Sequence, residues 1–264
     1  MKLGAYQFAV TGSLQNNLDK IKNAISQAAS QKVELLIFPE CALTGYPPHD
    51  IPSADRIHED EVNSAIEDLQ KMAAGNNMYI VIGTITICKG QYYNSALVLQ
   101  PHGNRIIYNK RALWGWDREN FCAGNSAGVF QIADTKIGIR ICFEVRFPEY
   151  FRELYREDTD LNIILFYDIS NRDDVKRYEL IQSHIRTRAV ENVCPILTVN
   201  TSKTFQTAPT ALYDQSGNPL AELKRNQEAL LTYDFMKTAF SFGEQGRKEI
   251  SDLLTNQSRG TKPV

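Results

Sequence analysis

The fold is decided by the stretch IGIRICFEVRFPE, residues 137–149. We predict a buried strand from Lys136 to Ile141, with Cys142 where this strand meets a loop. A helix is predicted over 148–156, because proline is favoured in the first position of a helix. In α/β sheets, sites are usually built at such strand ends. The stretch therefore predicts an α/β protein with a cysteine at a candidate site.

Working outward, strands and helices are distinguished by hydrophobic spacing. Strands are predicted at 2–10, 33–38, 78–88, 92–100, 105–109, 129–133, 161–167, 195–200, 211–214, 220–223 and 230–235, and further helices at 16–31, 58–74 and 175–191. The helices come in two groups, each followed by paired strands, and no linker divides the chain. The order predicts one domain of layered helices and sheets.

Bulk composition limits the function classes. The formal charge is −2, from 29 basic and 31 acidic residues, so no general attraction to nucleic acid or an anionic membrane is expected. No signal peptide or apolar run of ~20 residues is visible, which predicts a cytoplasmic protein. The five cysteines contain no C-x-x-C pair and the histidines no ligand pattern, so we expect reduced thiols and no metal.

Three residues at strand ends could perform one reaction together: Glu40, Lys110 and Cys142. A thiolate can attack the poorly electrophilic carbonyl of an amide, provided that a base removes its proton. A carboxylate can take this proton and return it to the leaving amine. A lysine and a backbone N–H, expected to be that of Phe143, can stabilise the oxyanion by several kcal/mol. Taken singly, each residue also has a structural explanation: a buried cysteine, a loop carboxylate and a solvated lysine.

Several motifs around these residues resemble the nitrilase-like carbon–nitrogen hydrolase superfamily. FPECALTGYP at 38–47 resembles its glutamate motif, YNKRAL at 108–113 its lysine motif, and residues 137–149 its cysteine motif. RENFCAG at 118–124 resembles the segment that carries a second active-site glutamate, and RTRAVEN at 186–192 resembles a further helical motif. The resemblance extends to about Phe235.

The resemblance implies a fold and a set of roles. The fold would be a four-layer α-β-β-α sandwich, a single domain over 1–242 followed by a polar arm or disordered tail over 243–264. Cys142 would be the nucleophile, Glu40 the base and Lys110 the oxyanion lysine. Glu119 would be the second glutamate, holding Lys110 or the substrate amide. A homodimer or higher even oligomer is expected, and no metal or organic cofactor is needed.

Substrate preference is less constrained. Tyr46, Trp114, Trp116 and Phe143 could line an aromatic pocket for an aliphatic acyl chain, or could pack in the core or a dimer seam. Tyr167 and Asp168 lie where the chain departs from the family pattern, so they are expected near the substrate, and Arg172 could also reach it. Arg146 is expected to support the site by ion pairing. The carbamoyl-amino-acid branch tends to have a second arginine beside Arg146, whereas this chain has Val145.

The leading hypothesis is an amidase that releases ammonia or an amine from a small linear amide. A carbamoyl-amine hydrolase or a nitrilase are alternatives within the family. From other classes, we consider a catalytically silent binding protein, an acyl transferase on the same fold, and a redox thiol protein. The last would need a resolving cysteine near Cys142.

Overall fold

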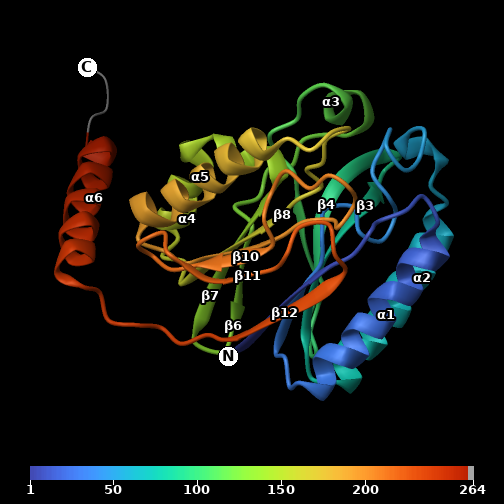
Figure 1. The fold of residues 1–264 in the computed structure, drawn as a ribbon, viewed down its shortest axis with the longest axis horizontal. Helices are drawn as coiled ribbons and strands as arrows, with labels where there is room; N and C mark the ends of the chain where they lie inside the picture. Colours follow the sequence, from blue (N-terminus) through green and yellow to red (C-terminus); the bar gives the residue numbers. More distant parts are fainter. Residues whose placement is uncertain (261–264) are drawn as a thin grey trace.

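The computed structural model describes residues 1–260, with side chains described to Thr255. Two six-stranded sheets face each other, with helices on both outer faces (Figure 1). The first sheet has the order β12-β1-β2-β3-β4-β5, and the second has the order β11-β10-β9-β8-β7-β6. This arrangement confirms the predicted α-β-β-α sandwich.

The elements follow the predicted windows to within a few residues. The first sheet contains β1 (Lys2–Gln7), β2 (Leu35–Ile37), β3 (Tyr79–Cys88), β4 (Gln91–Leu99), β5 (Ile106–Asn109) and β12 (Ala229–Asp234). The second contains β6 (Val129–Ile132), β7 (Thr135–Ile141), β8 (Leu161–Leu165), β9 (Ile196–Val199), β10 (Ala211–Tyr213) and β11 (Pro219–Glu222). The helices are α1 (Leu14–Ser30), α2 (Glu59–Gly75), α3 (Trp116–Asn120), α4 (Pro148–Arg156), α5 (Val175–Asn192) and α6 (Phe242–Gly260), with short 3₁₀ turns η1 (Ala54–Arg56) and η2 (Cys142–Arg146).

The buried strands divide their side chains between two layers of core. Leu35 and Ile37 face the other sheet, whereas Leu36 between them packs under α1 and α2. In the second sheet, Ile163 faces the first sheet and Ile164 packs under α4 and α5. Successive side chains of a strand point to opposite faces, so a continuous apolar run suits a strand covered on both sides.

Parallel pairing brings strand ends to one edge of each sheet. β1, β2 and β3 are parallel, as are β7, β8 and β9. The segments after β2, β7 and β8 carry most of the predicted site residues, and the segment after β5 carries Lys110, Trp114, Trp116 and Glu119. The two sets of loops meet across the sandwich, where Glu40 N–H donates to the Phe166 carbonyl over 3.2 Å. The fold thus builds the site from residues that follow strands of both sheets.

Two segments contain helices that were not predicted. The stretch 114–128, where no strand or helix was predicted, contains the short helix α3. The polar C-terminal arm is helical in the described residues, where α6 lies at one end of the molecule after an extended connector (Figure 1). Part of α6 is held by polar contacts, including Tyr155 Oη to Asp252 Oδ1 at 2.5 Å and Ser216 Oγ to Glu244 Oε1 at 2.5 Å. These contacts explain why a polar sequence becomes ordered there.

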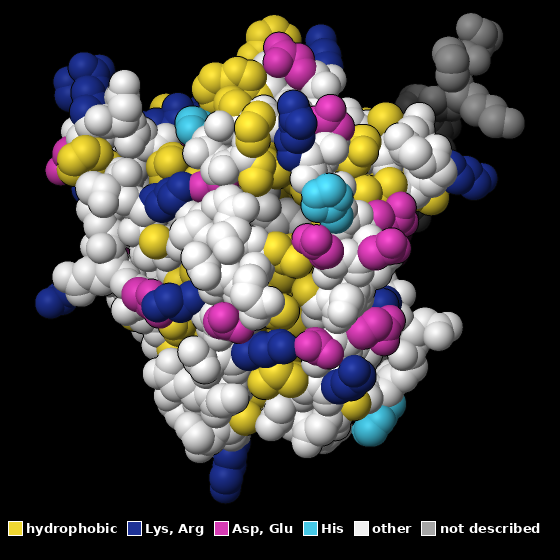
Figure 2. Space-filling model, turned by 90° about the vertical axis from the view of Figure 1, so that its right-hand side faces the viewer, with side chains coloured by type: hydrophobic (Ala, Val, Ile, Leu, Met, Phe, Trp, Pro, Cys, Tyr) yellow, Lys and Arg dark blue, Asp and Glu magenta, His cyan; other side chains and the backbone are white. Residues whose placement is uncertain are grey.

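The surface and the helices carry two further observations. Acidic and basic side chains are interspersed on the face shown in Figure 2, in keeping with the small net charge. Across residues 1–260, none of the helices combines the length and the apolar character that crossing a membrane requires.

Candidate active site

Lys110 lies at the centre of a buried polar cluster. It follows β5 directly, and its Nζ lies 2.7 Å from Glu40 Oε1 and 2.6 Å from Asp117 Oδ2. The side chains of Lys110 and Glu40 are 2% and 1% exposed. The Lys110 ammonium therefore bridges two carboxylates out of contact with bulk water. Charges buried in this way are stable only when each one has a partner.

Glu40 is fixed through both of its oxygens. Asn94 Nδ2 donates to Glu40 Oε1 over 2.7 Å, and the Tyr167 backbone N–H donates to Glu40 Oε2 over 2.9 Å. The turn that carries Glu40 packs on Gly83 of β3, where a Cβ would lie 2.1 Å from the Pro39 carbonyl oxygen. Only glycine fits there, so the position of Glu40 depends on close approach of its turn to the sheet.

Cys142 occupies a tight turn at the end of β7. Its φ of 45° lies in the left-handed region, which is uncommon for a residue other than glycine and is often found at functional sites. The buried Glu144 carboxylate holds this turn, since it accepts the Ile141 N–H at 2.7 Å and the Arg111 N–H at 2.7 Å. It also accepts the Tyr108 hydroxyl at 2.8 Å. Glu144 therefore couples the Cys142 turn to the loop that begins at Lys110.

The cluster sets the charge state of each group. Burial alone would lower the pKa of Lys110, but the carboxylates of Glu40 and Asp117 raise it well above its usual value, so the ammonium is retained. Burial raises the pKa of Glu40, Lys110 opposes the rise, and Asp117 adds to it. Burial also raises the pKa of the Cys142 thiol, as does Glu40, while Lys110 opposes this. The resting thiol is therefore protonated beside a carboxylate suited to accept its proton.

A cavity of about 340 Å³ opens onto Lys110 and Cys142. Its other lining residues are Tyr46, His49, Trp114, Trp116, Asp117, Phe143, Val145, Arg146, Tyr167, Asp168, Ile169, Arg177 and Ile181. One wall is an aromatic stack in which the ring centroids of Tyr46 and Tyr167 are 5.0 Å apart. Apart from Arg172, every predicted pocket residue thus borders one cavity, and Glu40 contacts Lys110 from outside the lining.

Two predicted roles require correction. Glu119 is exposed, and Asp117 is the carboxylate that contacts Lys110. Both belong to the five-residue helix α3, whose inward face carries position 117 and not 119. Arg146 has no ion-pair partner among the described residues; its guanidinium lies 5.9 Å from the Phe143 ring centroid. The nearby Glu144, a plausible partner in sequence, is instead occupied by backbone N–H groups.

Several residues at the site had no role in the sequence prediction, among them Asp117, Asn94, His49 and Arg177. Asp117 directly precedes the segment 118–124, which resembles a motif of the family. Asn94 is a polar residue within a predicted strand, and this position is the sequence signal for a buried amide. His49 belongs to the loop after the glutamate motif and has no spacing pattern. Arg177 reaches the cavity in place of Arg172, because α5 directs positions 177 and 181 toward it.

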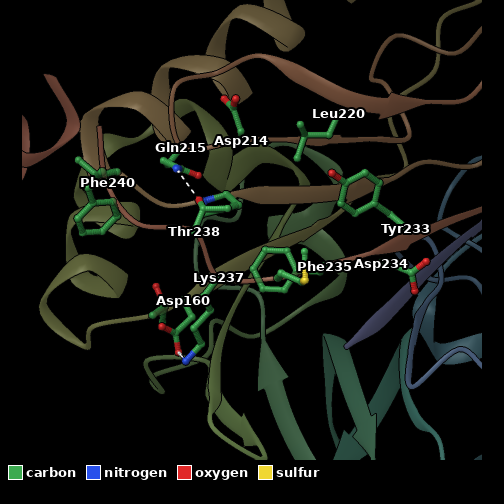
Figure 3. Close-up of a pocket in the computed structure, with 14 residues that line it drawn as sticks. Asp160, Asp214, Gln215, Leu220, Tyr233, Asp234, Phe235, Lys237, Thr238 and Phe240 are labelled. Atoms are coloured by element: carbon green, nitrogen blue, oxygen red, sulfur yellow. Dashed lines mark hydrogen bonds and ion pairs between the residues drawn. The ribbon is translucent and has the colours of Figure 1, made fainter. Parts of the chain in front are cut away.

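A second cavity, of about 420 Å³, lies away from this cluster (Figure 3). Its lining includes Asp160, Leu220, Tyr233 and residues 235–238, from the second sheet, β12 and the connector to α6. Lys237 Nζ pairs there with Asp160 Oδ2 at 3.0 Å. None of the candidate catalytic residues lines it. Across residues 1–255 no group of His, Cys, Asp and Glu side chains is arranged to hold a metal ion.

The fold is an α/β sandwich of two facing sheets, and its main polar site is a buried Glu–Lys pair on a cavity that a cysteine also lines. The model of the family described as "Carbon-nitrogen hydrolase" matches residues 2–238. This chain belongs to the carbon–nitrogen hydrolase family.

Curated relatives agree with this membership, and a solved structure agrees with the fold. The chain is 26% identical to an (R)-stereoselective amidase from Pseudomonas sp over 203 residues, covering 76% of this chain and 70% of that one. It is 28% identical to a 2-oxoglutaramate amidase from Bacillus subtilis (strain 168), covering 75% of each. Its fold is similar to that of a mutant of an amidase from Nesterenkonia sp. AN1 in complex with butyramide, with a TM-score of 0.81, 21% identity, and coverage of 97% of this chain and 96% of that one.

Proposed function

We propose that this chain hydrolyses the carbon–nitrogen bond of a small linear amide, with Cys142 as nucleophile, Glu40 as general base and Lys110 as oxyanion stabiliser. The observation that carries the proposal is the buried Lys110, held between Glu40 and Asp117 on the cavity that Cys142 also lines. A purely structural ion pair would not need a cavity beside it. The relatives include both amidases and nitrilases; the amidase names support an amide as the substrate, and the nitrilase names keep a nitrile as the alternative.

The acylation step begins with a neutral thiol. Glu40 takes the proton from Cys142 Sγ as the sulfur attacks the amide carbonyl carbon. The oxygen becomes negative and is stabilised by the Lys110 ammonium and the Phe143 N–H, which are in place before charge develops. Collapse of this intermediate breaks the C–N bond, and Glu40 passes its proton to the leaving amine. A thioester on Cys142 remains.

Deacylation uses the same groups with water. Glu40 accepts a proton from water as its oxygen attacks the thioester carbonyl, and Lys110 again stabilises the oxyanion. When the C–S bond breaks, the proton returns to sulfur and the carboxylic acid leaves. Asp117 acts through Lys110: it keeps the ammonium charged, and it is oriented by the Tyr46 hydroxyl, which donates to Asp117 Oδ1 over 2.7 Å. Tyr46, Trp114, Trp116 and Phe143 would contact the acyl chain.

The proposal is tested by ammonia release from a panel of small amides, ureido compounds and nitriles. The wild-type protein should release ammonia from amides, and Cys142→Ala should not. Cys88→Ala is the matched control, because Cys88 is exposed at the end of β3 and lies outside the cavity. Intact mass after rapid quenching should show an acyl adduct on wild type and Cys88→Ala only. Absence of both ammonia and adduct with every compound would favour a binding protein.

We also propose that the enzyme acts as a cytoplasmic homodimer. Exposed apolar side chains on α6 support the dimer: Phe242, Ile250, Leu253 and Leu254 are 94%, 58%, 57% and 62% exposed. Apolar patches of this kind favour association. Light scattering of the purified protein would give the mass of the assembly, and a monomer at micromolar concentration would contradict the proposal. Fractionation of the host cells would test the location.

A further inference from the structure

Asn94 contacts both the proposed base and the proposed oxyanion lysine. It lies in β4 and is 1% exposed, and its Nδ2 donates to Glu40 Oε1 over 2.7 Å. Its backbone carbonyl accepts the Lys110 N–H over 2.8 Å. A single residue of β4 thus holds the side chain of Glu40 and the main chain of Lys110, so it fixes the position of one relative to the other.

The hydrogen bonds to the Glu40 carboxylate distinguish its two oxygens. An ionised carboxylate offers about four acceptor sites, shared equally between its oxygens. Oε1 accepts from Asn94 Nδ2 and from Lys110 Nζ, each at 2.7 Å, whereas Oε2 accepts only the Tyr167 N–H, at 2.9 Å, among the donors of residues 1–255. Oε1 is therefore fully occupied. The free acceptor site on Oε2 is left to receive the proton of Cys142.

The thiol of Cys41 holds the Asn94 amide in the orientation that this contact needs. Cys41 Sγ donates to Asn94 Oδ1 over 3.7 Å. Cys41 is completely buried, and this burial raises the pKa of its thiol well above the usual value, so the S–H donor is retained. If the amide turned around, its oxygen would face the Glu40 carboxylate, and two acceptors would oppose each other. The Cys41 thiol therefore favours the orientation that turns Nδ2 toward Glu40.

We propose that Asn94 is a positioning residue for the general base Glu40, and that the Cys41 thiol fixes the Asn94 amide. Because Asn94 helps to occupy Oε1, the carboxylate presents Oε2 to the proton of Cys142. This inference rests on the proposed amide hydrolysis and deepens it. Neither Asn94 nor Cys41 lines the cavity, so both act through Glu40 and not by touching the substrate.

The charge state of Glu40 gives this role a measurable sign. Burial raises the pKa of Glu40, and the hydrogen bond from Asn94 opposes the rise because it stabilises the carboxylate. Removal of the Asn94 amide should therefore raise that pKa further, whereas removal of the Asp117 charge should lower it. The titratable groups that interact with Glu40 are Lys110, Asp117, Cys41, Tyr46, Cys142 and Tyr167.

The test compares wild type with Asn94→Leu, which keeps the branched shape of the side chain and removes its donor. For the best amide, kcat should fall by about 10- to 150-fold with little change in KM, because the lost hydrogen bond is to a charged group. The acid limb of kcat/KM should move to higher pH. Asn162→Leu is the matched control, because Asn162 is a fully buried asparagine of β8 outside the cavity lining. It should lower the melting temperature and keep the wild-type acid limb.

Variants of Cys41 test the second contact, and they keep the inference testable if Asn94→Leu does not fold. Cys41→Ala removes the donor to Asn94 Oδ1 and should move the acid limb to higher pH, by less than Asn94→Leu. Cys41→Ser restores a hydroxyl donor at the same place and should return the limb toward that of wild type. In the double variant Cys41→Ala/Asn94→Leu, the limb should match that of Asn94→Leu alone, because Cys41 acts through the amide.

A readout without catalysis separates this inference from the proposed function. The titration of Glu40 can be followed by NMR of its carboxyl carbon, with Glu40→Gln identifying the signal. If wild type hydrolyses amides but Asn94→Leu leaves the titration midpoint unchanged or lowers it, the positioning role is overturned and the amidase stands. A higher midpoint in Asn94→Leu, together with no hydrolysis of any amide by wild type, would uphold the contact with Glu40 and reject the hydrolase. An equal movement of the acid limb in Asn162→Leu would also overturn the positioning role.

Discussion

Asp117 and Glu119 provide the sharpest test of the site, because they are carboxylates two positions apart in the same short helix. Asp117 Oδ2 lies 2.6 Å from Lys110 Nζ, whereas Glu119 is exposed. Asp117→Asn keeps the size of the side chain and removes its charge. We expect this variant to lose activity, and Glu119→Gln to retain it.

The magnitude follows from the contact that is lost. A hydrogen bond to a charged group contributes roughly 1.5–3 kcal/mol, which corresponds to about a 10- to 150-fold fall in kcat/KM if the contact matters fully in the transition state. Asp117 also helps to raise the pKa of Glu40, so its neutralisation lowers that pKa. The acid limb of the pH profile should therefore move to lower pH in Asp117→Asn.

The assay is the pH dependence of kcat/KM for the best amide, measured for wild type and both variants, with thermal melting to confirm folding. Equal losses of activity in Asp117→Asn and Glu119→Gln would refute the assignment of Asp117 as the second carboxylate partner of Lys110. An acid limb that stays in place or moves to higher pH in Asp117→Asn would refute the electrostatic reasoning.

Three further predictions concern the support of the site. Gly83→Ala places a Cβ 2.1 Å from the Pro39 carbonyl oxygen, so it should destabilise the fold by about 1–3 kcal/mol or more, as measured by urea unfolding. It should also weaken activity, because it displaces Glu40. A variant as stable as wild type would contradict this close packing. Glu144→Gln replaces an acceptor carboxylate with an amide facing N–H donors, so it should lower the free energy of unfolding by roughly 1–3 kcal/mol. Cys142 should also be alkylated more slowly in this variant at constant pH. In wild type, the acid limb of the kcat/KM profile should lie above the usual glutamate pKa, because burial raises the pKa of Glu40 and a protonated Glu40 cannot act as a base. An acid limb at or below the usual glutamate pKa would argue against Glu40 as the base.

Much of the fold was predictable from local patterns. The uninterrupted apolar strands before Glu40 and Cys142 indicate strands covered on both faces, and the structure places both between a helical layer and a second sheet. The helix over 148–156 begins at its proline as predicted. These features depend on residues close together in the chain, so hydrophobic spacing and proline geometry suffice. The order of the C-terminal arm depends on distant partners such as Tyr155, which no local pattern contains.

The candidate site divides in the same way. The sequence by itself determined that Glu40, Lys110 and Cys142 stand at strand ends, and its motifs indicated the family. Only the tertiary structure decided that Asp117 contacts Lys110 and that Arg177 reaches the cavity. Residues two positions apart on a helix point about 200° apart, so a single acid can face inward, and its identity depends on how the helix is docked. That docking is fixed by packing between segments remote in sequence, and one chain's local pattern does not encode it.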